Sequence, residues 1–153
     1  MNGIYHKVGI RATPDAIYEA LTTQSGLAGW WTREVGGAFS GGQSRKGEMI
    51  EFRFGPHGFD MRVEDVQPAR RVAWECQAGP EDWVGSHVEF ELRPTEKGDM
   101  TLVFFRHQDW KKISEFTAHC SMKWATFLLS LKDLVEHGRG RPAPDDLKID
   151  DFN

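Results

Sequence analysis

The chain has 153 residues and a formal net charge of −4, and 39% of its residues are hydrophobic and 27% charged. These values are typical of one folded globular domain and exclude a disordered or fibrous protein. Lysine and arginine are dispersed, which excludes a basic patch for nucleic acid, and no apolar run approaches the roughly 18 residues of a membrane span.

The N-terminal part of the sequence predicts a strand followed by two short helices. Apolar residues alternate over residues 4–10, the pattern of a strand. In ATPDAIYEALTT, Thr13 occupies the N-cap position and Pro14 the first helical position. SGLAGWW predicts the second helix, which ends in two tryptophans. Because adjacent helical residues diverge by about 100°, we expect Trp30 to anchor this helix in the core and Trp31 to face the mouth of a cavity.

The middle of the sequence predicts a glycine-rich loop and then a run of strands. Residues 36–47 show no apolar period and lack the Gly-Lys-Ser/Thr ending of a phosphate-binding loop. Five alternating segments follow, over residues 49–54, 59–66, 71–76, 87–94 and 100–110. No helix separates them, so with the first strand they predict an antiparallel meander of about six strands with one face toward solvent. Acidic residues expected on that face are Glu51, Asp60, Glu64, Glu89 and Glu91.

Residues 113–138 predict a long amphipathic helix of about 24 residues, or roughly 36 Å. Its apolar stripe comprises Phe116, Cys120, Trp124, Phe127, Leu128, Leu131, Leu134 and Val135, and Met122, Ala125 and Leu129 widen it. The opposite stripe is polar and is expected to face water: His119, Lys123, Thr126, Ser130, Asp133 and His137. Gly138 occupies the C-terminal cap position. Residues 139–153 are rich in proline and charge and predict an irregular tail, and we expect residues 1–153 to form a single domain.

Four stretches, in this order along the chain, carry a resemblance to a known family: TPDAIYEALTT with GLAGWW after it, VEDVQPARRVAWEC, TLVFFRHQDW, and KWATFLLSLKDLVEHGRGRPAPDD. With them the chain resembles the START-like (SRPBCC, helix-grip) superfamily, in the branch named after the C-terminal domain of the activator of the heat-shock-protein-90 ATPase. The resemblance implies an α+β helix-grip fold, in which a curved antiparallel sheet wraps around a long C-terminal helix. It also implies a cavity between them for hydrophobic small molecules. Function varies widely across such a superfamily, so the fold does not settle it.

The candidate ligand-binding residues lie on predicted inward positions of the strands or on the helix face toward the sheet. An aromatic pocket with one or two polar groups is the usual form of a site for an apolar ligand. The set is Trp31, Phe52, Met61, Trp74, Phe90, Phe105, His107, Cys120, Trp124 and Phe127. For any single one of these side chains, filling the core is the favoured role, and a ligand site remains open for the set as a whole.

His107 is a weak candidate for acid/base catalysis, and no other catalytic residue is indicated. The inward face of the last strand carries either His107 or Arg106, because a shift of one residue swaps the two faces. The family's pattern of a strand ending in apolar-x-apolar-x-His favours His107. A hydrogen bond to a neighbouring loop is the alternative role for this imidazole.

Other chemistry has little support in the sequence. Cys76 and Cys120 show no disulfide-framework spacing and are expected to be reduced, inert core thiols. The six histidines show no metal-ligand pairing, and there is no nucleophile elbow. We therefore expect neither a metal nor a cofactor.

The leading hypothesis is a protein, not an enzyme, that binds a hydrophobic small molecule, lipid-like or aromatic, between the sheet and the long helix. Two other classes stay open. One is a small hydrolase or cyclase acting on an aromatic substrate through His107, and the other is a chaperone ATPase-activating or regulatory interaction module. A homodimer is also left open. Because the N-terminus has no apolar signal region, a cytoplasmic location is expected.

Overall fold

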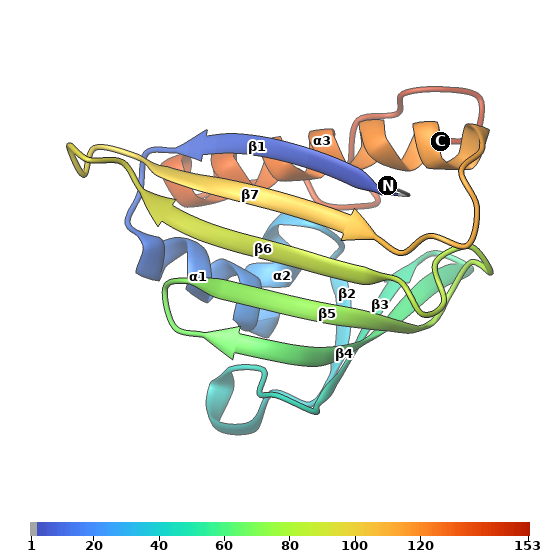
Figure 1. Ribbon diagram of the computed structural model, residues 1–153, viewed down its shortest axis with the longest axis horizontal. Coiled ribbons are helices and arrows are strands. Elements are labelled where there is room, and N and C mark those ends of the chain that lie inside the picture. The colour runs from blue at the N-terminus through green and yellow to red at the C-terminus, as the bar shows by residue number, and fades with distance from the viewer. Residues whose placement is uncertain (1–2) are drawn as a thin grey trace.

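A curved antiparallel sheet and three helices form the computed structural model, which describes residues 3–153 (Figure 1). Residues 1–2 of the expected domain span lie outside the described part. The strands are β1 Ile4–Ile10, β2 Glu34–Gly37, β3 Met49–Phe54, β4 His57–Gln67, β5 Arg71–Ala78, β6 His87–Pro94 and β7 Thr101–Gln108. The helices are α1 Pro14–Thr22, α2 Gln24–Trp30 and α3 Glu115–His137, with a 3-10 turn at Ser40–Gly42.

Seven strands, in the order β1-β7-β6-β5-β4-β3-β2, make up the sheet within the described residues, where the sequence predicted about six. The additional strand is β2, whose sequence EVGG has too few apolar residues to show an alternation. Its two glycines fall in the predicted loop, which begins at residue 36. Pairing with β3, with Val35 opposite Phe52, produces this edge strand, so its existence depends on the neighbouring strand.

The two short helices follow directly from their caps. The Thr13 hydroxyl accepts a hydrogen bond from the Ala16 amide at 3.2 Å, as predicted for the start of α1. Thr23 ends α1 and caps α2 by accepting from the Gly26 amide at 3.0 Å. The two helices pack at one end of the side of the sheet that α3 also covers (Figure 1).

The register of β7 is the one that the family pattern favoured. Val103, Phe105 and His107 point inward and are at most 1% exposed. The alternate residue Arg106 points outward and pairs with carboxylates of β6. The acidic residues expected on the solvent face lie on this outer side: arginines of neighbouring strands pair with Asp60, Glu89 and Glu91, and His87 lies beside Glu64.

The polar stripe of α3 faces water only in part: Asp133 and His137 are exposed as the sequence predicted, whereas three other residues of the stripe are covered. Lys123 and Ser130 are buried at 8% and 2% exposure, and only 10% of the His119 side chain is exposed. Met122 and Leu129, predicted to widen the apolar arc, are instead more than half exposed. The reason is that the tail, residues 139–153, packs along the polar stripe.

The tail makes specific contacts although it contains no helix or strand. The Arg141 amide donates to the Ser130 hydroxyl at 2.6 Å, and the Lys123 ammonium donates to Asp146 at 2.5 Å. Ala143 exchanges backbone hydrogen bonds with residues 31 and 33. The tail is therefore docked against both α3 and the end of α2. No helix of the described residues is long and apolar enough to cross a membrane.

Candidate functional site

A cavity of about 540 Å³ lies at the N-terminal end of α3. Five parts of the chain enclose it: the end of α2, the first half of α3, the β3–β4 turn, the β5–β6 loop and the tail. The lining residues are Trp31, Phe54, Pro56, His57, Gly58, Phe59, Gly79, Pro80, Trp83, Phe116, His119, Cys120, Lys123, Trp124, Phe127, Asp146, Phe152 and Asn153. Its volume falls in the range of small-molecule sites, and aromatic side chains make up much of the wall.

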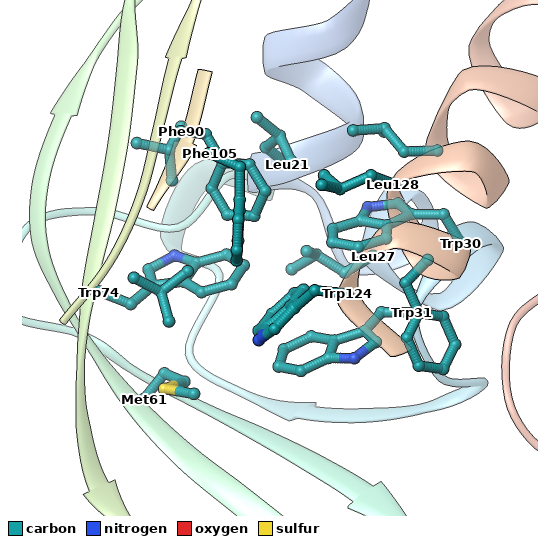
Figure 2. Packing of buried hydrophobic residues seen from close by; sticks show 14 of the residues in the cluster. Leu21, Leu27, Trp30, Trp31, Met61, Trp74, Phe90, Phe105, Trp124 and Leu128 are labelled. Carbon is teal, nitrogen blue, oxygen red and sulfur yellow. The ribbon is translucent and has the colours of Figure 1, made fainter. Parts of the chain in front are cut away.

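Trp31 joins the cavity wall to the packed core. It is the C-cap residue of α2 and is 2% exposed. Its ring lies 4.9 Å from the ring of Trp124 and 5.8 Å from that of Phe59, both in the cavity wall. Figure 2 shows Trp31 and Trp124 side by side, with Trp30 above them in this view.

Trp30 lies outside the cavity wall. Its ring is fully buried, and its indole nitrogen donates to the Ala20 carbonyl at 3.0 Å. The Ser130 hydroxyl on α3 donates to the Trp30 carbonyl at 2.9 Å. Trp30 thus connects α2 to α1 and α3 through hydrogen bonds. The Trp31 ring, in contrast, lines the cavity although it is almost fully buried.

Four of the ten predicted ligand-binding residues line the cavity: Trp31, Cys120, Trp124 and Phe127. The other six lie in the packed core behind the cavity and are at most 1% exposed: Phe52, Met61, Trp74, Phe90, Phe105 and His107. The division has a simple geometric cause. Inward positions in the middle of the strands meet the helices and one another, while the cavity lies beyond the ends of β3 and β5.

Both ring nitrogens of His107 form hydrogen bonds with other residues of the protein. The Trp124 indole donates to His107 Nδ1 at 3.1 Å, so Nε2 carries the proton and donates to the Ser86 hydroxyl at 2.8 Å. Ser86 in turn donates to the Trp83 carbonyl at 2.5 Å. Burial lowers the pKa of His107 to about 3. This imidazole holds two cavity-wall tryptophans in place and does not itself reach the cavity.

Sequence reasoning missed most of the cavity wall because those residues lie in turns and in the tail. Phe54 and Phe59 flank the β3–β4 turn, Trp83 lies in the β5–β6 loop, and Phe152 is next to the last residue. Phe54 and Phe59 fall in the alternating segments 49–54 and 59–66, but no periodic pattern marks Trp83 or Phe152. One signal was available, since a tryptophan in a loop rich in glycine and proline needs a buried place for a large ring.

The two cysteines lack the character of nucleophiles. Both are free and buried. Burial raises the pKa of the Cys76 thiol to about 11 and that of the Cys120 thiol, which lines the cavity, to about 12. Because the thiolate is the reactive form, both side chains act as small apolar groups at neutral pH.

One group of side chains on the outer face resembles a metal site in composition. Glu64, Glu75 and His87 hold their ligand atoms within 4.8 Å of one another. However, Glu64 accepts from His87 at 2.7 Å and Glu75 from Arg62 at 2.9 Å. Both carboxylates therefore already have hydrogen-bond partners in the protein, and we assign no ion to this group.

A family model and a solved structure point to the same family for this chain. Residues 11–136 match the family described as Activator of Hsp90 ATPase homolog 1-like protein. The solution structure of an Aha1 dimer from Colwellia psychrerythraea is 44% identical, with a TM-score of 0.80 over 92% of this chain and 100% of that chain. No curated protein sequence matches significantly.

More distant structures share the fold. SSP2350 from Staphylococcus saprophyticus is 19% identical, with a TM-score of 0.72 over 92% of this chain and 97% of that chain. CalU16 from Micromonospora echinospora is 20% identical, with a TM-score of 0.70 over 93% of this chain and 77% of that chain. The architecture is therefore the α+β helix-grip fold expected from the sequence, with seven strands.

Proposed function

Because the chain belongs to the family of Activator of Hsp90 ATPase homolog 1-like proteins, we propose that it binds a hydrophobic small molecule, lipid-like or aromatic, at the N-terminal end of α3. The observation that carries this proposal is the cavity of about 540 Å³ with its aromatic wall. Burying an apolar ligand there releases roughly 25 cal/mol for each Å² of apolar surface removed from water. Residues 1–153 act in this proposal as one domain, whose tail supplies part of the wall.

The enzymatic alternative has less support. A hydrolase or cyclase acting through His107 needs that imidazole to reach a substrate, whereas both of its nitrogens are occupied within the core. A general base must lie within hydrogen-bonding reach of the proton that it removes. A chaperone-activating role rests on the family description alone.

Native mass spectrometry of the purified protein, together with titration of 1-anilinonaphthalene-8-sulfonate (ANS), tests the binding function. We expect a co-purifying small molecule, or saturable ANS binding that quenches tryptophan fluorescence, because three cavity-lining residues are tryptophans: Trp31, Trp83 and Trp124. Cys120→Phe, which fills the cavity from α3, should abolish ANS binding. Met122→Phe is the matched control, because Met122 is two residues away on the exposed face of the helix. Unchanged ANS binding by Cys120→Phe would refute the proposed site.

We also propose that the chain forms a homodimer. The 44% identical Colwellia psychrerythraea protein is described as a dimer. On this chain Met122 and Leu129, one heptad apart on α3, are 55% and 54% exposed, and paired apolar residues at that spacing suit a helix contact. Sedimentation velocity should show a dimer for the native chain and a monomer for Leu129→Lys. A native monomer at high concentration contradicts this proposal without affecting ligand binding.

A further inference from the structure

The first part of the tail, residues 139–147, is held firmly against the rest of the fold. Ala143 exchanges backbone hydrogen bonds with the segment at the end of α2. The buried Lys123 ammonium on α3 donates to Asp146 and to the Leu147 carbonyl. Movement of this part would break backbone hydrogen bonds and expose a buried charge, so it is a fixed part of the structure.

Residues 148–153, the tip of the tail, are held differently, because most of their hydrogen bonds lie within the tail. Asp150 Oδ1 accepts from the amides of Phe152 and Asn153 at 2.9 and 3.2 Å. Among the described residues, one hydrogen bond joins the tip to α3, between His119 Nδ1 and Asp150 Oδ2 at 2.7 Å. The tip therefore keeps its own turn when this hydrogen bond breaks. Figure 1 shows the end of the tail beside the first turns of α3.

Apolar contact adds little to the attachment of the tip. The Phe152 ring lies 4.8 Å from the His119 ring and 5.7 Å from the Phe116 ring, yet Phe152 is 66% exposed. Hydrophobic stabilisation scales with the apolar surface removed from water, so little of it is lost when this ring moves away from α3. The hydrogen bond between His119 and Asp150 is therefore the main attachment of the tip.

The tip forms one side of the mouth of the cavity. The exposed residues of the cavity wall mark this mouth: Pro56 and His57 in the β3–β4 turn, Gly79 in the β5–β6 loop, and Phe152 and Asn153 in the tip. A molecule that enters the cavity from solvent passes between these three segments.

The other two sides of the mouth are fixed to the sheet. The pairing of β3 with β4 continues as far as Phe54 opposite His57, at the turn itself. In the β5–β6 loop, the Gly85 amide donates to the Cys76 carbonyl at 2.9 Å, and the Cys76 amide donates to the Ser86 carbonyl at 2.9 Å. Segments with backbone hydrogen bonds to a sheet open at a higher free energy than a segment that is bonded mainly to itself. The tip is therefore the side of the mouth that opens most readily.

We propose that the tip of the tail is a lid, which swings away from α3 to admit or release a ligand and which the hydrogen bond between His119 and Asp150 holds closed. The hinge follows Leu147, whose carbonyl stays bonded to Lys123. This inference rests on the proposed binding function and adds to it the route by which the ligand enters and leaves.

Alkylation of Cys120 by iodoacetamide measures lid opening without any ligand. Cys120 lines the cavity and is 5% exposed, whereas Cys76 lies outside the cavity wall. His119→Phe removes the hydrogen bond to the tip and keeps a ring in the wall. Burial and, to a lesser extent, the Asp150 carboxylate raise the pKa of the Cys120 thiol, and this variant retains that carboxylate. We expect Cys120 to be labelled roughly two- to fivefold faster, the range of one partly exposed charged pair, and Cys76 at the native rate.

His57→Phe is the matched control for this measurement, because His57 lies in the mouth on the β3–β4 turn. It makes the same change of side chain on a fixed side of the mouth. Both cysteines of this variant should be labelled at the native rates.

The kinetics of ANS binding test the lid in a second way. Asp150→Ala should raise the association and dissociation rates by the same two- to fivefold and leave Kd nearly unchanged, because a lid sets the barrier that a ligand crosses in both directions. A residue that only contacts the ligand would change mainly the dissociation rate. Asp151→Ala is the control, since Asp151 is the next residue and is exposed, and stopped-flow fluorescence should give native rates for it.

The outcomes separate the lid from the binding function. If the native protein binds no ANS, the binding function fails, and Cys120 alkylation still tests the lid. If His119→Phe labels Cys120 at the native rate, or labels both cysteines faster to the same degree, the lid is overturned. A change in the ANS dissociation rate alone in Asp150→Ala also overturns the lid and leaves the binding function standing.

Discussion

The two ends of the space beneath the sheet are filled in different ways. Beneath the C-terminal half of α3, helices close the space. A Cβ atom on Gly29 of α2 would lie 3.0 Å from Leu134, and one on Gly140 of the tail would lie 2.4 Å from the Gly29 carbonyl oxygen. Beneath the N-terminal half, turns and the tail close the space, and a cavity of about 540 Å³ is left.

The difference shows why a large content of aromatic residues is compatible with both a core and a site. At the packed end, Phe90 meets Trp30 at 79° and Trp74 at 67°, edge to face, although Trp30 itself stacks on Trp31 at 13°. At the open end, Phe59 and Trp83 lie face to face at 12°. Side chains of two helices interdigitate and exclude voids, whereas turns and the tail meet the N-terminal half of α3 around an unfilled cavity.

Truncating one aromatic ring at the packed end and one at the cavity end should give the largest difference in stability between the two ends. Phe90→Ala should lower the free energy of unfolding by about 3–5 kcal/mol, because Phe90 is fully enclosed and its neighbours are fixed. Phe127→Ala should cost less than about 3 kcal/mol, because Phe127 already borders a cavity. Urea denaturation measures both values, and equal losses would show that the two ends are packed alike.

The buried ion pair that attaches the tail to the open end should have the next largest effect. Asp146→Asn leaves the buried Lys123 ammonium without its carboxylate and should cost about 3 kcal/mol. Asp145→Asn removes the ion pair between Asp145 and Arg33. Both of these side chains are more than half exposed, so the free energy of unfolding should fall by less than about 1 kcal/mol. Urea denaturation of the pair provides the check. Similar losses in the two variants would mean that the tail is not held through Asp146.

The free energy of unfolding should depend on pH through His107, which is buried behind the cavity wall and neutral. The unfolded-state pKa is about 6.5 and burial lowers the folded-state pKa to about 3, so the stability contributed by the neutral form is present above pH 6.5. It is lost progressively as the pH falls toward 3, because the unfolded state binds the proton first. Between pH 7 and 5 the native protein should lose about 2 kcal/mol more than His107→Gln does. Parallel losses in the two proteins, measured by denaturation at each pH, would contradict a buried neutral His107.

The smallest effect concerns thiol reactivity. Both thiols have raised pKa values, so iodoacetamide at pH 8 should label Cys76 and Cys120 far more slowly than in urea. Only Cys120 lines the cavity, so ANS should slow its labelling further and leave Cys76 unchanged, as followed by peptide mass spectrometry. Equal protection of both cysteines by ANS would place the probe elsewhere.

Local patterns of the sequence sufficed for most of the fold. The helix starts and ends depend on residues close in sequence, such as Thr13 at the start of α1 and Gly138, with φ 83°, after α3. The inward register of β7 follows from alternation together with the family pattern. For the site, the α3 residues Cys120, Trp124 and Phe127 were predictable from the same stripe, because the stripe turned toward the sheet continues over the cavity.

What the sequence by itself determined is therefore which face of the predicted strands, and which central stripe of α3, turns toward the sheet interior, since spacing along the chain sets that direction. Only the tertiary structure decided what lies against the other faces. Lys123 and Ser130 look like solvent-facing residues until the tail, which begins at residue 139, covers them. The cavity arises in the same way. Its wall combines α3 with turns and a tail that are far apart in sequence, so its position depends on how these segments meet in space.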